Sequence, residues 1–212
     1  MAVGFTHSVV FVNQSDNEGD VCLFQTLKQP VAKTSSLVWL ARHVFKTTTV
    51  TFEWSGVNCF VWSNSSSSID PGVIIVGSQA WAAGLSDNNR VTLTYVSNAY
   101  TFENLSTGTT AGTLTIQEDS TLPAGLAVTG IGMDGYGTIV AVTQPNTILQ
   151  FVPDPQYWIS FGTFTRGAVI DRDAIISAEV VFPVNVLSMT AIYTKQNTWE
   201  FTPTSTLRLV QD

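Results

Sequence analysis

Short runs of β-branched and aromatic residues, many of them alternating apolar and polar positions, recur along the whole chain. Runs of this length, bounded by turn residues, are typical of strands. Regular spacing of roughly fourteen such runs predicts an all-β fold, an antiparallel β-sandwich or a close relative of one. The predicted strands are residues 8–13, 20–26, 47–54, 58–63, 72–76, 90–96, 100–104, 112–117, 138–142, 147–152, 157–165, 178–182, 188–193 and 198–202.

One stretch is ambiguous. Between Ser35 and Phe45, apolar residues at helical spacing follow a serine that could cap a helix, but no glycine closes the segment. A short helix and a strand fit equally well. Turns are clearer, because Asp16–Gly19, Asp87–Asn89 and Ser65–Ser68 are rich in residues that favour tight backbone.

The chain also resembles itself when it is shifted by about 90 to 100 residues. The matches keep one order along the chain, which indicates an internal duplication with a first half at 1–98 and a second at 99–212. The matched positions are Phe11, Asn13 and Ser15 with Phe102, Asn104 and Ser106; Val21–Gln25 with Thr113–Gln117; Val50 and Phe52 with Leu149 and Phe151; Trp62 and Ser63 with Ile159 and Ser160; Gly72–Ile75 with Gly167–Ile170; and Leu93, Thr94, Tyr100 and Phe102 with Met189, Thr190, Trp199 and Phe201. Chance similarity between β-rich segments is the alternative.

No Pro-, Gly- or charge-rich linker separates the two halves. We therefore expect one compact unit with pseudo-two-fold symmetry. Two sandwiches in series and two interleaved halves both remain possible.

Composition narrows the functional classes. Of 212 residues, 44% are hydrophobic and 12% are charged, and the net charge of -7 comes with nine scattered Lys and Arg. A basic stripe for nucleic acid is therefore lacking. We also see neither a signal peptide nor a long apolar span, which predicts a cytoplasmic protein without integral membrane association, or one exported by a leaderless route.

Neither cysteine has the surroundings of a reactive thiol. Cys22 and Cys59 each lie in a predicted strand, so buried reduced thiols are expected and a disulfide is the alternative. A Cys–His pair with His43 lacks an activating signature, and two histidines with two such cysteines do not give zinc spacing. We predict no catalytic residue and no metal site.

A glycine fingerprint of dinucleotide-binding proteins is present at residues 130–135, but a strand follows it where a helix would be required. A turn, or a close approach between strands, is the better interpretation. No cofactor is predicted.

Acidic side chains suggest two further chemistries. Asp16, Glu18 and Asp20 crowd one turn, and Asp171 and Asp173 flank Arg172, yet neither group matches a calcium loop. A solvated hairpin tip and a surface ion pair are the better interpretation. Two carboxylates could also serve glycoside hydrolysis, but spacing selects no pair from Glu53, Glu103, Glu118 and Glu200.

The best ligand-binding candidate is aromatic and amide-rich. Six tryptophans are present, and Trp81, in a Gly- and Ala-rich stretch outside a clear strand, is the one expected to be exposed. Together with Asp87, Asn88 and Asn89 in a nearby loop, it forms a candidate glycan-binding site.

Several tracts resemble the RhiA-type proteins, rhizosphere-expressed soluble proteins of rhizobia. They are Val9–Ser15, Asp20–Gln25, Thr47–Trp62 with the following Pro71–Val73, Gly130–Gly137 and Tyr157–Gly162, which extends the resemblance over most of the chain. The resemblance implies an abundant intracellular, plant-associated or fungal-type protein with no assigned chemistry, so it carries over no catalytic residue.

Three functions remain. The first is a non-enzymatic interaction or structural protein that forms a homo-oligomer or larger assembly, indicated by low charge and many edge-capable strands. The second is a lectin-like module that binds glycans. The third is a membrane-active β-sandwich toxin, which the net charge of -7 disfavours on anionic lipids.

Overall fold

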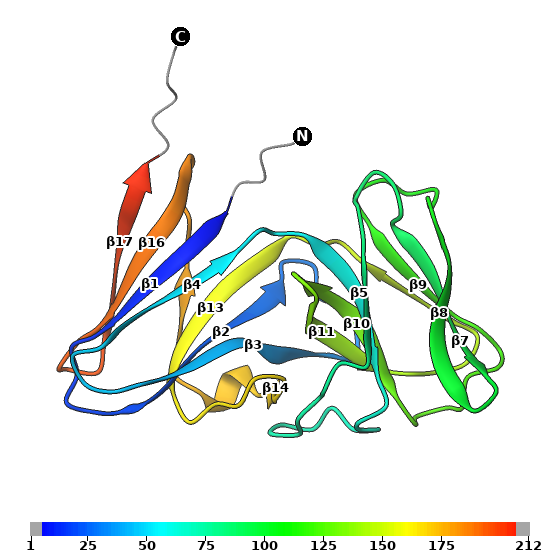
Figure 1. The fold of residues 1–212 in the computed structure, drawn as a ribbon, viewed down its shortest axis with the longest axis horizontal. Helices are drawn as coiled ribbons and strands as arrows, with labels where there is room; N and C mark the ends of the chain where they lie inside the picture. Colours follow the sequence, from blue (N-terminus) through cyan, green and yellow to red (C-terminus); the bar gives the residue numbers. More distant parts are fainter. Residues whose placement is uncertain (1–5, 207–212) are drawn as a thin grey trace, which may run out of the picture.

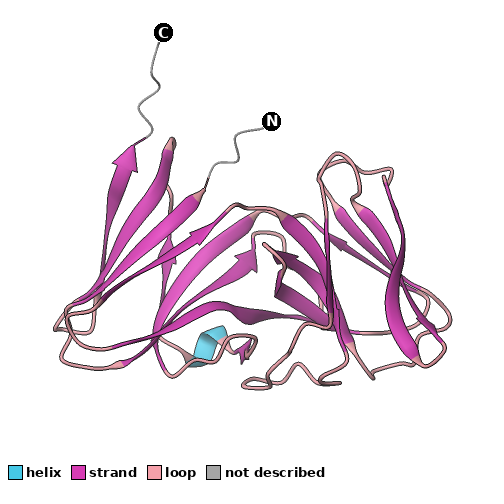
Figure 2. Ribbon diagram, in the orientation of Figure 1, coloured by secondary structure: helices cyan, strands magenta, loops and turns pink. Residues whose placement is uncertain are grey.

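The computed structural model describes residues 6–206, and within them the fold is almost entirely β (Figures 1 and 2). Three sheets account for it: one of nine strands, here called the central sheet, and two of four strands. The only helical element described is one short 3-10 turn, η1 (Arg172–Ala174). The strands are β1 (His7–Asn13), β2 (Gly19–Leu27), β3 (Thr34–Val44), β4 (Thr49–Trp54), β5 (Asn58–Ser63), β6 (Gln79–Ala82), β7 (Arg90–Val96), β8 (Ala99–Ser106), β9 (Leu114–Glu118), β10 (Val128–Met133), β11 (Tyr136–Val142), β12 (Thr147–Phe151), β13 (Pro155–Gly162), β14 (Val169–Ile170), β15 (Ser177–Val180), β16 (Val186–Tyr193) and β17 (Trp199–Thr206).

The central sheet runs in the order β15-β13-β2-β3-β11-β10-β5-β6, with β14 added against β3. Two four-stranded sheets, β17-β16-β1-β4 and β8-β7-β9-β12, stand on one face of it near its opposite ends (Figure 1). The first packs on the β15 end and the second on the β6 end, giving a first and a second sandwich. The all-β, sandwich-like prediction is confirmed.

Each sandwich has its own apolar core. In the first, fully buried Phe11, Leu23 and Trp39 belong to one cluster, whereas in the second Phe60, Phe102 and Phe151 belong to another. Burial of this apolar surface is the dominant stabilising contribution.

The strands of the two four-stranded sheets alternate between buried and more exposed residues. Strands such as β9 and β12 bury every second residue, because one face meets the core and the other meets solvent. Central strands β2, β5 and β10 are instead buried almost throughout, since both faces of that sheet are covered.

The sheets are not purely antiparallel. Strand β1 pairs with β16 in parallel, and β7 pairs with β9 in parallel. Each of these pairs joins strands far apart in the chain or separated by a crossover, which local sequence does not reveal.

The two sandwiches correspond strand by strand in their sheet order. In the small sheets, β17, β16, β1 and β4 hold the same places as β8, β7, β9 and β12. In the central sheet, counted inward from its two ends, β15, β13, β2 and β3 hold the same places as β6, β5, β10 and β11. The first sandwich thus combines β1 to β4 with β13 and β15 to β17, and the second combines β5 to β8 with β9 to β12. Strand β8 begins at Ala99, just after the predicted division at residue 98. Descent by duplication stays a prediction.

Some local expectations change. The ambiguous stretch after Ser35 is strand β3, not a helix. Residues 72–76 form no strand; Ile74 makes an isolated bridge to Ala168. By place in the sheets β1 corresponds to β9, whereas the sequence matched Phe11 to Phe102 in β8.

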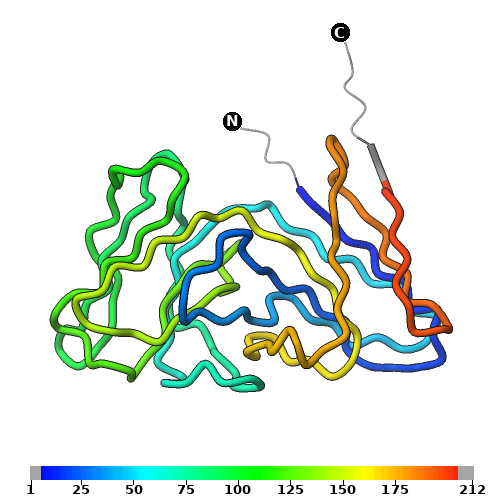
Figure 3. Tube along the Cα trace, turned by 180° about the vertical axis from the view of Figure 1, so that it is seen from behind, coloured from blue at the N-terminus to red at the C-terminus, as the bar shows by residue number. Residues whose placement is uncertain are grey.

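The segments 64–78 and 163–176 lie side by side against the face of the central sheet opposite the two small sheets (Figures 1 and 3). The amide of Gly72 donates to the Val169 carbonyl at 2.9 Å, and the Ile75 amide donates to the Gly167 carbonyl at 2.8 Å. These bonds fasten the two segments to one another.

Candidate functional site

The four residues predicted to bind glycans are split between a strand and a loop. Trp81 lies in β6, not outside a strand, and its half-buried ring packs 5.8 Å from that of Phe102 in the second core. Asp87 and Asn88 are exposed in the loop before β7, and Asn88 has a left-handed backbone with φ of 48°.

Asn89 is buried and its amide organises the loop. Its Nδ2 donates to the Thr110 carbonyl at 3.1 Å, and its Oδ1 accepts from the Gly108 amide at 2.6 Å. Both side-chain groups are therefore occupied within the chain, which leaves Asp87 and Asn88 as the accessible members of this candidate. Glycan binding here stays a prediction.

The thiols are free and buried, as expected, and the alternative of a disulfide is wrong. Burial raises the pKa of Cys59 to about 11, and the same cause raises that of Cys22 further. Both side chains stay protonated near neutral pH, where a thiol is a poor nucleophile.

His43 faces an acid, not a thiol. Its Nδ1 lies 3.1 Å from Asp20 Oδ1, and Asp20 Oδ2 also accepts from the Phe164 amide at 3.0 Å. Asp20, the last acidic residue of the Asp16–Asp20 turn, therefore holds the backbone at Phe164 in place. Among residues 6–206, no group of three His, Cys, Asp or Glu side chains is arranged to hold a metal ion.

Asp171 and Asp173 likewise have local roles. Asp171 caps η1 by accepting from the Asp173 amide at 3.1 Å, and the Arg172 guanidinium lies 3.7 Å from the centroid of the Trp158 ring. The motif is a capped turn stacked on an aromatic side chain.

The glycine-rich segment is the β10–β11 hairpin, which lies in the central sheet. A Cβ on Gly130 would overlap the Ile139 carbonyl oxygen, and one on Gly132 would overlap that of Tyr136. Both glycines therefore permit close approach between strands.

Of the four glutamates, Glu118 alone is buried, at 1% exposure, whereas Glu53, Glu103 and Glu200 are exposed. Burial raises the Glu118 pKa to about 7, although the Gln144 amide donates to Oε1 at 3.3 Å. Oε2 has no hydrogen-bond partner in the described structure. The sequence did not distinguish this residue from the other three.

The sequence also did not single out the open end of the central sheet at β15. Strand β15 pairs on one side with β13. Ile176, Val181 and Val184, which flank it, are 77%, 61% and 89% exposed. A row of unpaired backbone groups beside exposed apolar side chains is a surface suited to strand addition.

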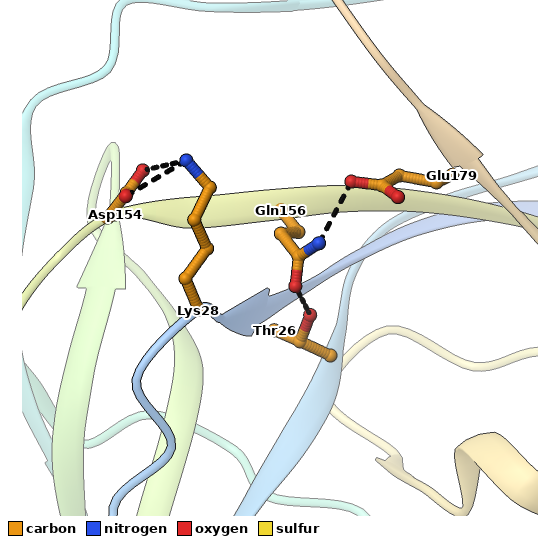
Figure 4. A network of polar contacts seen from close by, with 5 residues as sticks. All are labelled: Thr26, Lys28, Asp154, Gln156 and Glu179. Carbon is orange, nitrogen blue, oxygen red and sulfur yellow. Dashed lines mark hydrogen bonds and ion pairs between the residues drawn. The ribbon is translucent and has the colours of Figure 1, made fainter.

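Polar contacts hold β15 in place (Figure 4). Gln156 Nε2 in β13 donates to Glu179 Oε1 at 3.0 Å, and Thr26 Oγ1 in β2 donates to Gln156 Oε1 at 3.4 Å. Nearby, Lys28 Nζ pairs with Asp154 at 2.9 Å. The strand is thus anchored on its inner side while its outer side stays accessible.

No helix of the described residues is long and apolar enough to span a membrane.

Comparison with known proteins gives one consistent result. A family model described as RhiA matches residues 4–204. Protein RhiA of Rhizobium leguminosarum bv. viciae is 32% identical over 211 residues, which cover 96% of this chain and 89% of that protein. No solved structure matches.

Proposed function

The chain belongs to the RhiA family, and within it we propose a non-enzymatic protein that acts through binding and associates with copies of itself. The carrying observation is the open edge of the central sheet at β15, flanked by Ile176, Val181 and Val184. Burial of such side chains against a second copy is favourable.

The opposite end of the sheet is less suited to pairing. Gln79 in β6 accepts from the Phe102 amide of β8 at 3.1 Å and from Trp62 Nε1 at 2.7 Å, which ties β6 to the small sheet. The exposed residues of β6 are Ala80 and Ala82. Assembly through β15 therefore buries more apolar surface.

Pairing two β15 strands antiparallel about a two-fold axis restricts the register. Side chains that lie directly opposite each other on two paired strands point to the same face of the sheet. The two-fold axis must therefore pass midway between one residue and the same residue of the second copy. Centring on Glu179 would oppose two carboxylates, which is unfavourable. Centring on Ala178 places Glu179 opposite Ser177 of the second copy, and this is the register we propose.

Free, buried cysteines are typical of a reducing compartment, and they support a cytoplasmic location as part of the same proposal.

Sedimentation velocity over a range of concentrations tests the assembly. We expect a dimer or larger particle for the wild type and a monomer for the double variant Val181→Lys with Val184→Lys, because the charges would have to be desolvated at the interface. Ile148→Lys is the control, because Ile148 is 59% exposed and lies on β12, far from β15, at the edge of the small sheet of the second sandwich.

A wild type that stays monomeric at high concentration would refute self-association. A double variant that assembles as the wild type does would instead place the interface elsewhere.

A further inference from the structure

A cavity of about 430 Å³ lies on the face of the central sheet that the segments 64–78 and 163–176 cover. Its floor is apolar and comes from four strands of the central sheet, β3, β5, β10 and β11, with Leu37, Val61, Val128 and Val140 all buried. Volumes of this order are usual for small-molecule sites.

The corresponding place in the first sandwich is filled. Strands β13 and β5 are each second from an end of the central sheet, and the match of Trp62 with Ile159 sets Val61 against Trp158. Trp158 pairs across the strands with Phe24, and their rings stack 6.4 Å apart. Two large aromatic side chains occupy that half of the face.

Small residues stand at the matching positions of the second sandwich. Val61 pairs with Gly130, where backbone crowding prevents any larger residue. Close by, a Cβ on Gly137 would lie 3.3 Å from Val61 and 3.4 Å from Leu37. The cavity is therefore the space that Trp158 and Phe24 fill in the other half.

The rim of the cavity carries a positive charge. The Arg166 guanidinium lies 3.8 Å from the centroid of the Tyr136 ring, and Tyr136 is 41% exposed. In residues 6–206 the ion pairs are Lys28–Asp154 and His43–Asp20, so Arg166 has no carboxylate partner there. Its position beside the apolar floor suits a ligand with an anionic end.

Two serine hydroxyl groups at the cavity are already engaged within the chain. Ser63 Oγ donates to the Val76 carbonyl and accepts from the Ser65 amide at 3.1 Å, and Ser78 Oγ donates to Asn64 Oδ1 at 3.3 Å. These hydroxyl groups are therefore not available to a ligand, whereas the apolar floor would accommodate an apolar body well.

We propose that this cavity binds a small carboxylate with an apolar body, which lies on the floor around Val61 and Val140 while its carboxylate pairs with Arg166. The site is independent of the assembly edge at β15.

Isothermal titration calorimetry with phenylbutyrate and its neutral counterpart phenylbutanol tests the proposal. We expect saturable binding of one phenylbutyrate per chain, and weaker binding of the alcohol. Val61→Trp, which copies the filled half, should abolish binding of both probes. Ala80→Trp, at an exposed position on the rim, should do the same without altering the core.

Arg166→Gln isolates the charge. The variant should weaken phenylbutyrate binding about tenfold and leave phenylbutanol binding unchanged, because one charge-assisted hydrogen bond is lost. Arg172→Gln is the matched control, since Arg172 stacks on Trp158 in the filled half.

The site is refuted if the wild type binds neither probe saturably, or if Ala80→Trp binds them as the wild type does. Thermal unfolding of each variant establishes that it is folded, and should Val61→Trp not fold, Ala80→Trp decides. Equal effects of Arg166→Gln and Arg172→Gln would overturn the carboxylate as the ligand class.

Discussion

Asn13 and Glu118 end strands β1 and β9, which hold matching places in the two small sheets, and both side chains are buried. The Asn13 amide is fully used: Nδ2 donates to the carbonyls of Asn17 and Phe45, and Oδ1 accepts from the amide and hydroxyl of Ser15. Glu118 leaves one oxygen without a partner.

A second contrast lies on the far face of the central sheet, where Phe24 and Trp158 fill the first sandwich's end and Val61 and Gly137 border a cavity at the other end. The same arrangement of strands therefore supports one sandwich whose far face is filled by aromatic side chains, beside another with a buried carboxyl group and a cavity. We expect ligand binding and sensitivity to pH in the second sandwich, since stability is commonly given up at functional sites.

The largest effect should follow from emptying the filled half. Phe24 is fully buried, so Phe24→Ala should lower the free energy of unfolding by about 3–5 kcal/mol. Val61→Ala should cost much less, because it enlarges a cavity that already exists. Chemical denaturation of both variants measures the difference, and similar losses would break the contrast between the two halves.

The second prediction concerns pH. Folding raises the Glu118 pKa from 4.5 to about 7, so the unfolded chain ionises first as the pH rises. The contribution of Glu118 to the free energy of unfolding should be greatest below pH 4.5, fall between pH 4.5 and 7, and decrease by about 3 kcal/mol in total. Denaturation at a series of pH values measures it.

Glu118→Gln should remove this dependence and be more stable than the wild type above pH 7. Asn13→Asp should bring a similar dependence to the first sandwich, because it sets a carboxylate against the carbonyls of Asn17 and Phe45. If Glu118→Gln keeps the full pH dependence, Glu118 is not its source.

The smallest effect should come from the surface. The side chains of Lys28 and Asp154 are 58% and 54% exposed, so Lys28→Met should change the free energy of unfolding by about 0.5 kcal/mol or less. Raising the salt concentration should abolish even this difference. A loss well above 1 kcal/mol would show that the polar network of Figure 4 contributes more than an exposed pair does.

Local pattern was sufficient for the small sheets. Strands such as β1, β4, β7 and β12 have one face in a core and one in solvent, and the resulting alternation is visible in the residues themselves. The free thiols followed similarly, because cysteines in strands are usually buried.

Strands β6 and β10 were missed for opposite reasons. β10 is buried on both faces and carries two glycines, so it shows no alternation, and the sequence indicated only a turn or a close approach between strands there. β6 is a four-residue edge strand in which only Ala80, Trp81 and Ala82 are apolar, too short for a clear alternation. In both, pairing with β5 decides the structure, and that pairing depends on segments distant in sequence.

The sequence by itself determined the all-β class, most strand positions and the family, because these depend on local periodicity and on residues compared one by one. Only the tertiary structure decided which strands share a sandwich, that Asn89 supports a loop, that Glu118 loses its solvation, and that Val61 borders a cavity where Trp158 fills one. Each of these depends on what lies opposite a side chain across the sheets, and residues near in sequence do not contain that information.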